Sequence, residues 1–129
     1  MLTENNNNYP TEKRKTTESQ TDLVTVLREE IENSPKRIQD ELARSENPWS
    51  SCFNTRIFVI SVNLYLIKEE GLLASETIQN MQDKIKNIRD RADSIKNEYG
   101  WSSPPEQVKT ELLGMIKDLL LILDQNTQV

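Results

Sequence analysis

The sequence predicts an all-α fold: a small four- to five-helix bundle with a C-terminal antiparallel helical hairpin and a disordered N-terminal tail. Three observations lead to this prediction. Apolar side chains recur at alternating gaps of three and four, the spacing of a helical seam. The chain has 3 glycines in 129 residues, fewer than a fold rich in tight β-turns needs. Its most apolar run, residues 57–67, has no second strand-like segment with which to pair.

The first twenty residues are polar and contain almost nothing to bury. They hold a run of asparagines and a basic cluster, Lys13, Arg14 and Lys15. Burial in such a segment cannot offset the entropy lost on ordering, so we expect residues 1–20 to be disordered and the bundle to span 21–129. In its Asn-, Thr- and Ser-rich, leucine-poor composition, the tail resembles the unfolded N-terminal signals of bacterial type III secretion substrates. That resemblance implies an exported protein.

Two short helices are predicted next, at about 21–33 and 35–45, and both carry an apolar stripe. Ser34 is the expected N-cap of the second helix, and Pro35 suits its first position because proline lacks an amide hydrogen. The sequence leaves open whether these helices pack on the bundle or swing free.

The third predicted helix, residues 49–70, contains the most apolar run in the chain. A membrane span needs roughly 20 apolar residues, so we expect this shorter run to be a buried element and not a membrane span. Gly71 is a natural helix end. We expect this helix and the last one to form the centre of the bundle, covered by residues 21–45.

The fourth predicted helix, residues 75–99, has Ser75 as its expected cap and Gly100 as its end. Ordering its backbone and side chains costs more than burying one stripe returns, so the helix needs a partner. Its apolar seam consists of Ile78, Met81, Ile85, Ile88, Ala92, Ile95 and Tyr99.

The partner is the last helix, predicted at 104–124. Ser103 and Glu106 have the spacing of a capping box, and Pro104 would occupy the first helical position. The segment around Trp101 forms the turn.

Charges along the two helices predict the register of this hairpin. Facing residues in an antiparallel pair have a constant sum of residue numbers. Lys84 with Asp118 gives the same sum as Arg91 with Glu111, and the apolar layers agree to within about one residue. Exposed ion pairs add little stability, but they help to select a register.

No pattern in the chain indicates catalysis. There is no histidine, which removes the commonest general base and metal ligand. Cys52 is the one cysteine, and its neighbours Trp49 and Phe53 predict a buried, unreactive thiol. Phosphate-binding and dinucleotide-binding motifs are absent. We therefore expect no enzyme, no catalytic residues, no cofactor and no metal site.

The composition instead favours a protein that acts through contacts with other proteins or with itself, by coiled-coil or helix-in-groove association. The last helix has more apolar surface than one partner can cover, and Tyr99 and Trp101 are residues typical of interface hot spots. The candidate partner-binding residues are Tyr99, Trp101, Leu113, Ile116 and Leu120.

Three functional classes remain open. The first is an exported bacterial structural or effector component. The second is a cytoplasmic adaptor or chaperone that binds a client helix. The third is a nucleic-acid-binding regulator that uses residues 13–15 with Lys36 and Arg37. It ranks lower because a net charge of −5 disfavours contact with phosphates. The first twenty residues lack the apolar segment of a cleaved signal peptide, so we expect a location in the cytoplasm or export without one.

Overall fold

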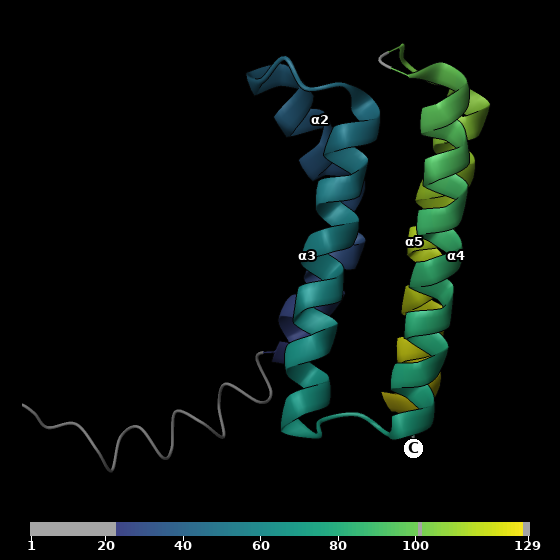
Figure 1. The fold of residues 1–129 in the computed structure, drawn as a ribbon. Helices are drawn as coiled ribbons and strands as arrows, with labels where there is room; N and C mark the ends of the chain where they lie inside the picture. The colour runs from purple at the N-terminus through teal and green to yellow at the C-terminus, as the bar shows by residue number, and fades with distance from the viewer. Residues whose placement is uncertain (1–22, 101, 128–129) are drawn as a thin grey trace, which may run out of the picture.

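The computed structural model describes residues 23–100 and 102–127, and all regular structure in them is helical (Figure 1). The predicted tail, residues 1–20, and Trp101 lie outside the described residues. The helices are an N-terminal helix at 23–32, α2 (Ser34–Arg44), α3 (Trp49–Glu70), α4 (Ser75–Tyr99) and α5 (Glu106–Thr127). The predicted all-α bundle with a C-terminal antiparallel hairpin is confirmed.

The N-terminal helix and α2 form one kinked arm. The amide of Asn33 donates to the carbonyl of Glu29 at 2.9 Å, so the helical hydrogen bonds continue across the junction. Pro35 has no amide hydrogen to continue them, and this bends the rod. The predicted capping role of Ser34 is wrong: its hydroxyl donates backwards to the carbonyl of Glu30 at 2.7 Å, a bond that also favours bending.

A sharp turn at Gly71 joins α3 to α4. The glycine has a φ of 67°, in the left-handed region that favours glycine. Its amide donates to the carbonyl of Lys68 at 3.1 Å, and the amide of Leu72 donates to Ile67 at 3.2 Å. These two bonds make a Schellman motif, which satisfies carbonyls at the helix end. Gly71 is therefore the helix end that the sequence predicted.

The apolar faces of the kinked arm, α3, α4 and α5 meet in one core. Successive helices α2 to α5 are neighbours, and α2 also contacts α5, which closes the bundle. Except for Tyr99, which is half-buried, every predicted seam position on α4 is buried. The core also receives Leu27 and Ile31 from the N-terminal helix, Ile38 from α2, and Leu112, Ile116, Leu119 and Leu123 from α5.

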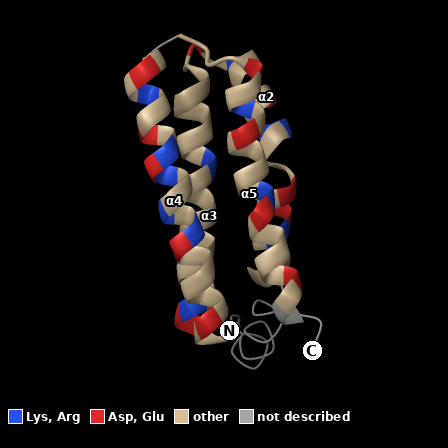
Figure 2. Cartoon of the chain, turned by 90° about the vertical axis from the view of Figure 1, so that its right-hand side faces the viewer, with Lys and Arg blue, Asp and Glu red and all other residues tan. Residues whose placement is uncertain are grey.

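The hairpin has the predicted register. Lys84 Nζ lies 3.2 Å from Asp118 Oδ2, and Arg91 donates to both carboxylate oxygens of Glu111 at 2.8 and 3.0 Å. Basic and acidic residues follow one another along α4 (Figure 2). The seam between these helices therefore has charges only at its edges, as the heptad pattern predicted.

Helix α4 has the predicted bounds, but the predicted capping role of Ser75 is wrong: the cap position is Ala74, and no side chain caps this end. The predicted start of α5 is also wrong. This helix begins at Glu106 rather than at Pro104, because the carbonyl of Pro105 accepts from the amides of the first turn. Neither correction changes the hairpin register.

Candidate protein-interaction surfaces

One candidate surface is a groove between the kinked arm and α5, here called the α5 groove. It has a volume of about 490 Å³. Its floor is mostly apolar, with one acidic residue from the arm and one basic residue from α5. It is lined by Ile31, Glu32, Pro35, Thr110, Leu113, Gly114, Lys117 and Leu120.

Gly114 leaves a bare patch of backbone beside this groove. A methyl group placed there would meet no atom within 4 Å, so no neighbouring element of the fold requires a glycine. Glycine inside a helix costs roughly 0.5–1 kcal/mol relative to alanine. A helix glycine that no neighbouring element requires, next to an apolar groove, leaves room for the close approach of another molecule to the backbone.

The predicted partner-binding residues divide into four groups. Leu113 and Leu120 line the α5 groove and are half-buried. Ile116 is 1% exposed and lies in the core, so its prediction as a partner contact is wrong. Ile116 belongs to the buried series of α5, whose three- and four-residue spacing directs its side chain into the core. The other members are Leu112, Leu119 and Leu123. Tyr99 is half-buried at the end of α4, where burial and the neighbouring Glu98 raise the pKa of its hydroxyl. Trp101 lies outside the described residues.

A second surface lies on α3 and was not predicted. Phe58 is 62% exposed, and Val62, Tyr65 and Leu66 are also exposed. The expectation that α3 forms the centre of the bundle is therefore wrong, because it is a corner helix with an apolar outer face. The signal was present as a second heptad on the same helix, here called the α3 outer seam: Ser51, Thr55, Phe58, Val62, Tyr65 and Glu69.

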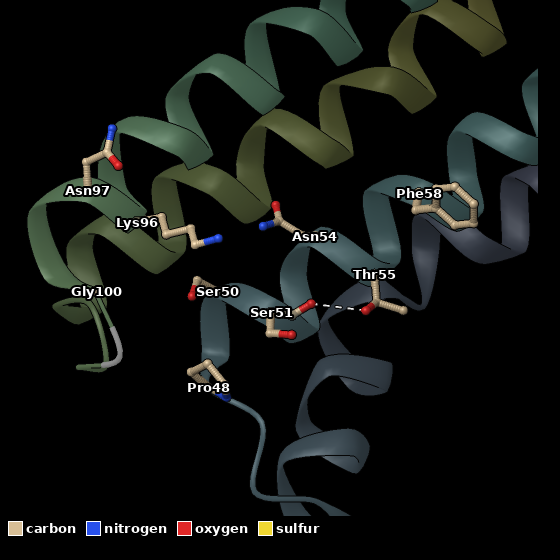
Figure 3. Close-up of a pocket in the computed structure, with 9 residues that line it drawn as sticks. All are labelled: Pro48, Ser50, Ser51, Asn54, Thr55, Phe58, Lys96, Asn97 and Gly100. Carbon is tan, nitrogen blue, oxygen red and sulfur yellow. Dashed lines mark hydrogen bonds between the residues drawn. The ribbon is translucent and has the colours of Figure 1, made fainter.

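A hollow of about 600 Å³ continues this seam towards the end of α4 (Figure 3). Thr55 belongs to both, and its hydroxyl donates to the carbonyl of Ser51 at 3.0 Å. Lys96 and Asn97 of α4 form the opposite side of the hollow. The seam and the hollow thus form one continuous outer surface.

By length and composition, α3 has the character of a membrane span, the one such helix in the described residues. Core helices of bundles have the same character, and 33% of its most apolar window is buried. Its Arg56 forms an ion pair with Glu30 of the N-terminal helix. The apolar composition of its inner face follows from packing, because Phe53, Ile57, Ile60, Leu64 and Ile67 lie in the common core.

Cys52 lies in the core at the end of the bundle where Trp49 and Phe53 stack, their ring centroids 5.2 Å apart. Burial, followed by the nearby carboxylate of Glu41, raises the pKa of the thiol. The thiolate, which is the nucleophilic form, is therefore disfavoured, in agreement with the predicted buried thiol. Lys109 Nζ lies 5.9 Å from the Trp49 ring centroid and covers its face.

In the described part of the chain, no group of three His, Cys, Asp or Glu side chains is placed to hold a metal ion. Comparisons of the chain with protein-family models, with curated proteins and with solved structures found no match.

Proposed function

We propose that this chain is a non-enzymatic interaction protein that binds an amphipathic helix of a partner in the α5 groove. The observation that supports this proposal most is Gly114, an uncompensated helix glycine beside an apolar floor made by Leu113 and Leu120. A helix laid against bare backbone can approach more closely than one that meets side chains, so dispersion contacts increase.

The rims of the groove favour one orientation of such a helix. Glu32 stands on the arm and Lys117 on α5, so the two sides of the groove carry opposite charges. A bound helix with a basic residue on one edge and an acidic residue on the other matches both rims. Apolar residues at three- and four-residue spacing would fill the floor between them. Charges of this kind set orientation and association rate more than affinity.

Photocrosslinking in cells tests the proposal. A photoreactive residue in place of Leu120 should give one protein adduct of defined mass. The same residue in place of Asp40, which lies on the exposed face of α2, is the matched control and should not give it. The variant Gly114→Leu, whose added side chain enters open space, should fill the groove and abolish the Leu120 adduct.

The proposal fails if Leu120 gives no adduct, or if the Asp40 control gives the same one. It also fails if Gly114→Leu leaves the adduct intact while circular dichroism shows an unchanged fold, because the groove would then not be the contact.

An exported component and a cytoplasmic adaptor are both compatible with this binding mode. Deleting residues 2–20 separates them. If the tail is an export signal, the deletion abolishes export while the helical spectrum of the bundle persists. If the protein is an adaptor, its location and the Leu120 adduct are both unchanged.

The nucleic-acid alternative draws less support from the surface. Lys36 Nζ lies 3.4 Å from Asp40, and Arg37 Nε lies 3.7 Å from Glu30. Both cations thus have acidic neighbours that oppose contact with phosphates. Residues 13–15 lie outside the described residues.

A further inference from the structure

The α3 outer seam has the form of half of a coiled coil. Its positions are separated by gaps of four, three, four, three and four. Leu66 adds a further exposed apolar side chain beside it. The seam positions from Ser51 to Tyr65 are uncharged, and Glu69 is the first charged one. A regular seam of this type packs knobs into holes with a second helix of the same periodicity.

We infer that the seam is covered by a second copy of this chain, with the two α3 helices antiparallel about a two-fold axis midway between Phe58 and Val62. In this arrangement Phe58 faces Val62 of the other copy, and Thr55 faces Tyr65. The gaps of the seam read the same in both directions about this point, so one patch is complementary to itself, as a two-fold interface requires.

Charges favour the antiparallel direction. In a parallel pair, Glu69 would face Glu69 of the other copy, and like charges would repel. In the antiparallel pair it faces Ser51, which lines the same hollow as Lys96. Neither Glu69 nor Lys96 forms an ion pair with the described residues of its own chain. Glu69 of each copy can therefore be neutralised by Lys96 of the other, twice per dimer.

Contacts within the chain place Lys96 within one helical turn of Ser51. Arg89 of α4 donates to the hydroxyl of Ser61 of α3 at 2.9 Å, which fixes how these antiparallel helices align. Two turns further along, Lys96 lies level with Asn54, and both line the hollow. Lys68 is directed elsewhere, because it lines a separate hollow with Gln79 and Gln82.

The size of the surface indicates that the hollow belongs to the interface. A stable dimer buries about 800 Å² on each partner. Phe58, Val62, Tyr65 and Leu66 are 62%, 41%, 57% and 43% exposed, and even a fully exposed Phe or Tyr buries only roughly 150–250 Å². These four side chains therefore fall short of this area by themselves, so the interface includes the hollow.

Light scattering and sedimentation of the full chain test the inference. The wild-type chain should show twice its monomer mass of 15.0 kDa. Phe58→Glu should shift it to the monomer. Leu121→Glu is the matched control, because Leu121 is also 62% exposed but lies on α5, and it should leave the dimer intact. Glu69→Lys and Lys96→Glu should each weaken the dimer, and their combination should restore it.

Disulfide trapping tests the direction independently of mass. A mixture of Phe58→Cys and Val62→Cys chains should crosslink to each other, and so should a mixture of Ser51→Cys and Glu69→Cys chains. Thr55→Cys should not crosslink to itself. Self-crosslinking of Thr55→Cys would indicate a parallel pair and overturn the inference.

A wild-type chain that remains monomeric, or equal effects of Phe58→Glu and Leu121→Glu, would also overturn it. So would a monomeric chain that cosediments with phosphatidylcholine vesicles and loses this with Phe58→Glu, because lipid would then cover the seam. Since Gly114→Leu should leave the dimer mass unchanged, and Phe58→Glu should leave the Leu120 adduct unchanged, failure of either proposal is distinguishable from failure of the other.

Discussion

At the residue scale, one carboxylate joins the N-terminal arm to α3. Glu30 accepts a hydrogen bond from Arg56 Nη1 at 3.3 Å and lies 3.7 Å from Arg37 Nε. The side chains of Glu30 and Arg56 are only 16% and 15% exposed. The Nε of Arg56 is buried without a hydrogen-bond partner, so this guanidinium depends on Glu30 for its neutralisation.

The variant Glu30→Gln should lower the free energy of unfolding by about 1–3 kcal/mol, because it leaves a mostly buried cation unpaired. Asp40→Asn is the matched control, since its ion pair with Lys36 is highly exposed, and it should change stability by less than about 0.5 kcal/mol. Urea unfolding followed by circular dichroism measures both. Equal effects would show that burial of the Glu30 pair has no energetic consequence.

The pair between Arg91 and Glu111 makes stability depend on pH. The hydrogen bond from Arg91 lowers the pKa of the Glu111 carboxyl below its ordinary value. The folded state therefore binds this proton less readily than the unfolded chain. The resulting stabilisation is fully present above the unfolded pKa of about 4.3 and is lost as the pH falls through the lower folded pKa.

We therefore expect Glu111→Gln to be less stable than the wild type at neutral pH. The difference should shrink as the pH falls below the ordinary glutamate range, where the wild-type carboxyl also becomes neutral. Urea midpoints of the two chains across the acidic range measure this effect. A difference that stays constant with pH would mean that the amide disturbs packing and that the charge contributes nothing.

At the scale of elements, the hairpin was predictable because two independent signals agreed. The seam of α4 requires an apolar partner, and the ion pairs at Lys84 and Arg91 select one register for α5. Helix ends were predictable where a glycine must adopt a positive φ, as at Gly71 and Gly100. Helix starts were less so, because Ser34 and Ser75 both have alternatives to capping.

The orientation of α3 was not predictable in the same way. Apolar residues cover two opposite faces of this helix, so the sequence does not say which face enters the core. The side chains of Phe53, Ile57, Ile60, Leu64 and Ile67 do so, while the equally regular α3 outer seam remains exposed. Only one wall of the α5 groove was predictable. Leu113 and Leu120 were predicted as surplus apolar surface on the last helix, whereas the sequence did not predict the kink at Pro35 that shapes the other wall.

Gly114→Ala tests whether the helix glycine of α5 serves stability or contact. Its backbone is helical and an added methyl meets open space, so alanine should raise the free energy of unfolding by about 0.5–1 kcal/mol. The same methyl should reduce the yield of the Leu120 crosslink. Thermal unfolding and crosslinking of one variant give both readouts. A variant that is less stable would show that this glycine is needed by the fold itself.

At the scale of the whole molecule, the question left open by the sequence is whether residues 21–45 pack or swing free. From residue 23 onward they pack. Leu27, Ile31 and Ile38 are fully buried in the common core. Arg28 also pairs with Asp124 near the end of α5, so the arm contacts the last helix as well as α3. The arm thus closes the bundle, and we expect all helices to unfold together.

Leu27→Ala should therefore destabilise the entire bundle by about 2–5 kcal/mol, through lost burial and the cavity left behind. Val26→Ala is the matched control on the same helix: Val26 is 38% exposed, so its loss should cost less than about 0.5 kcal/mol. Hydrogen exchange of amides in α4 and α5 measures whether the effect spreads. Faster exchange there in Leu27→Ala shows one cooperative unit, because those amides lie outside the substituted helix. Exchange unchanged in α4 and α5, with loss of protection confined to the arm, would show that the hairpin stands without it.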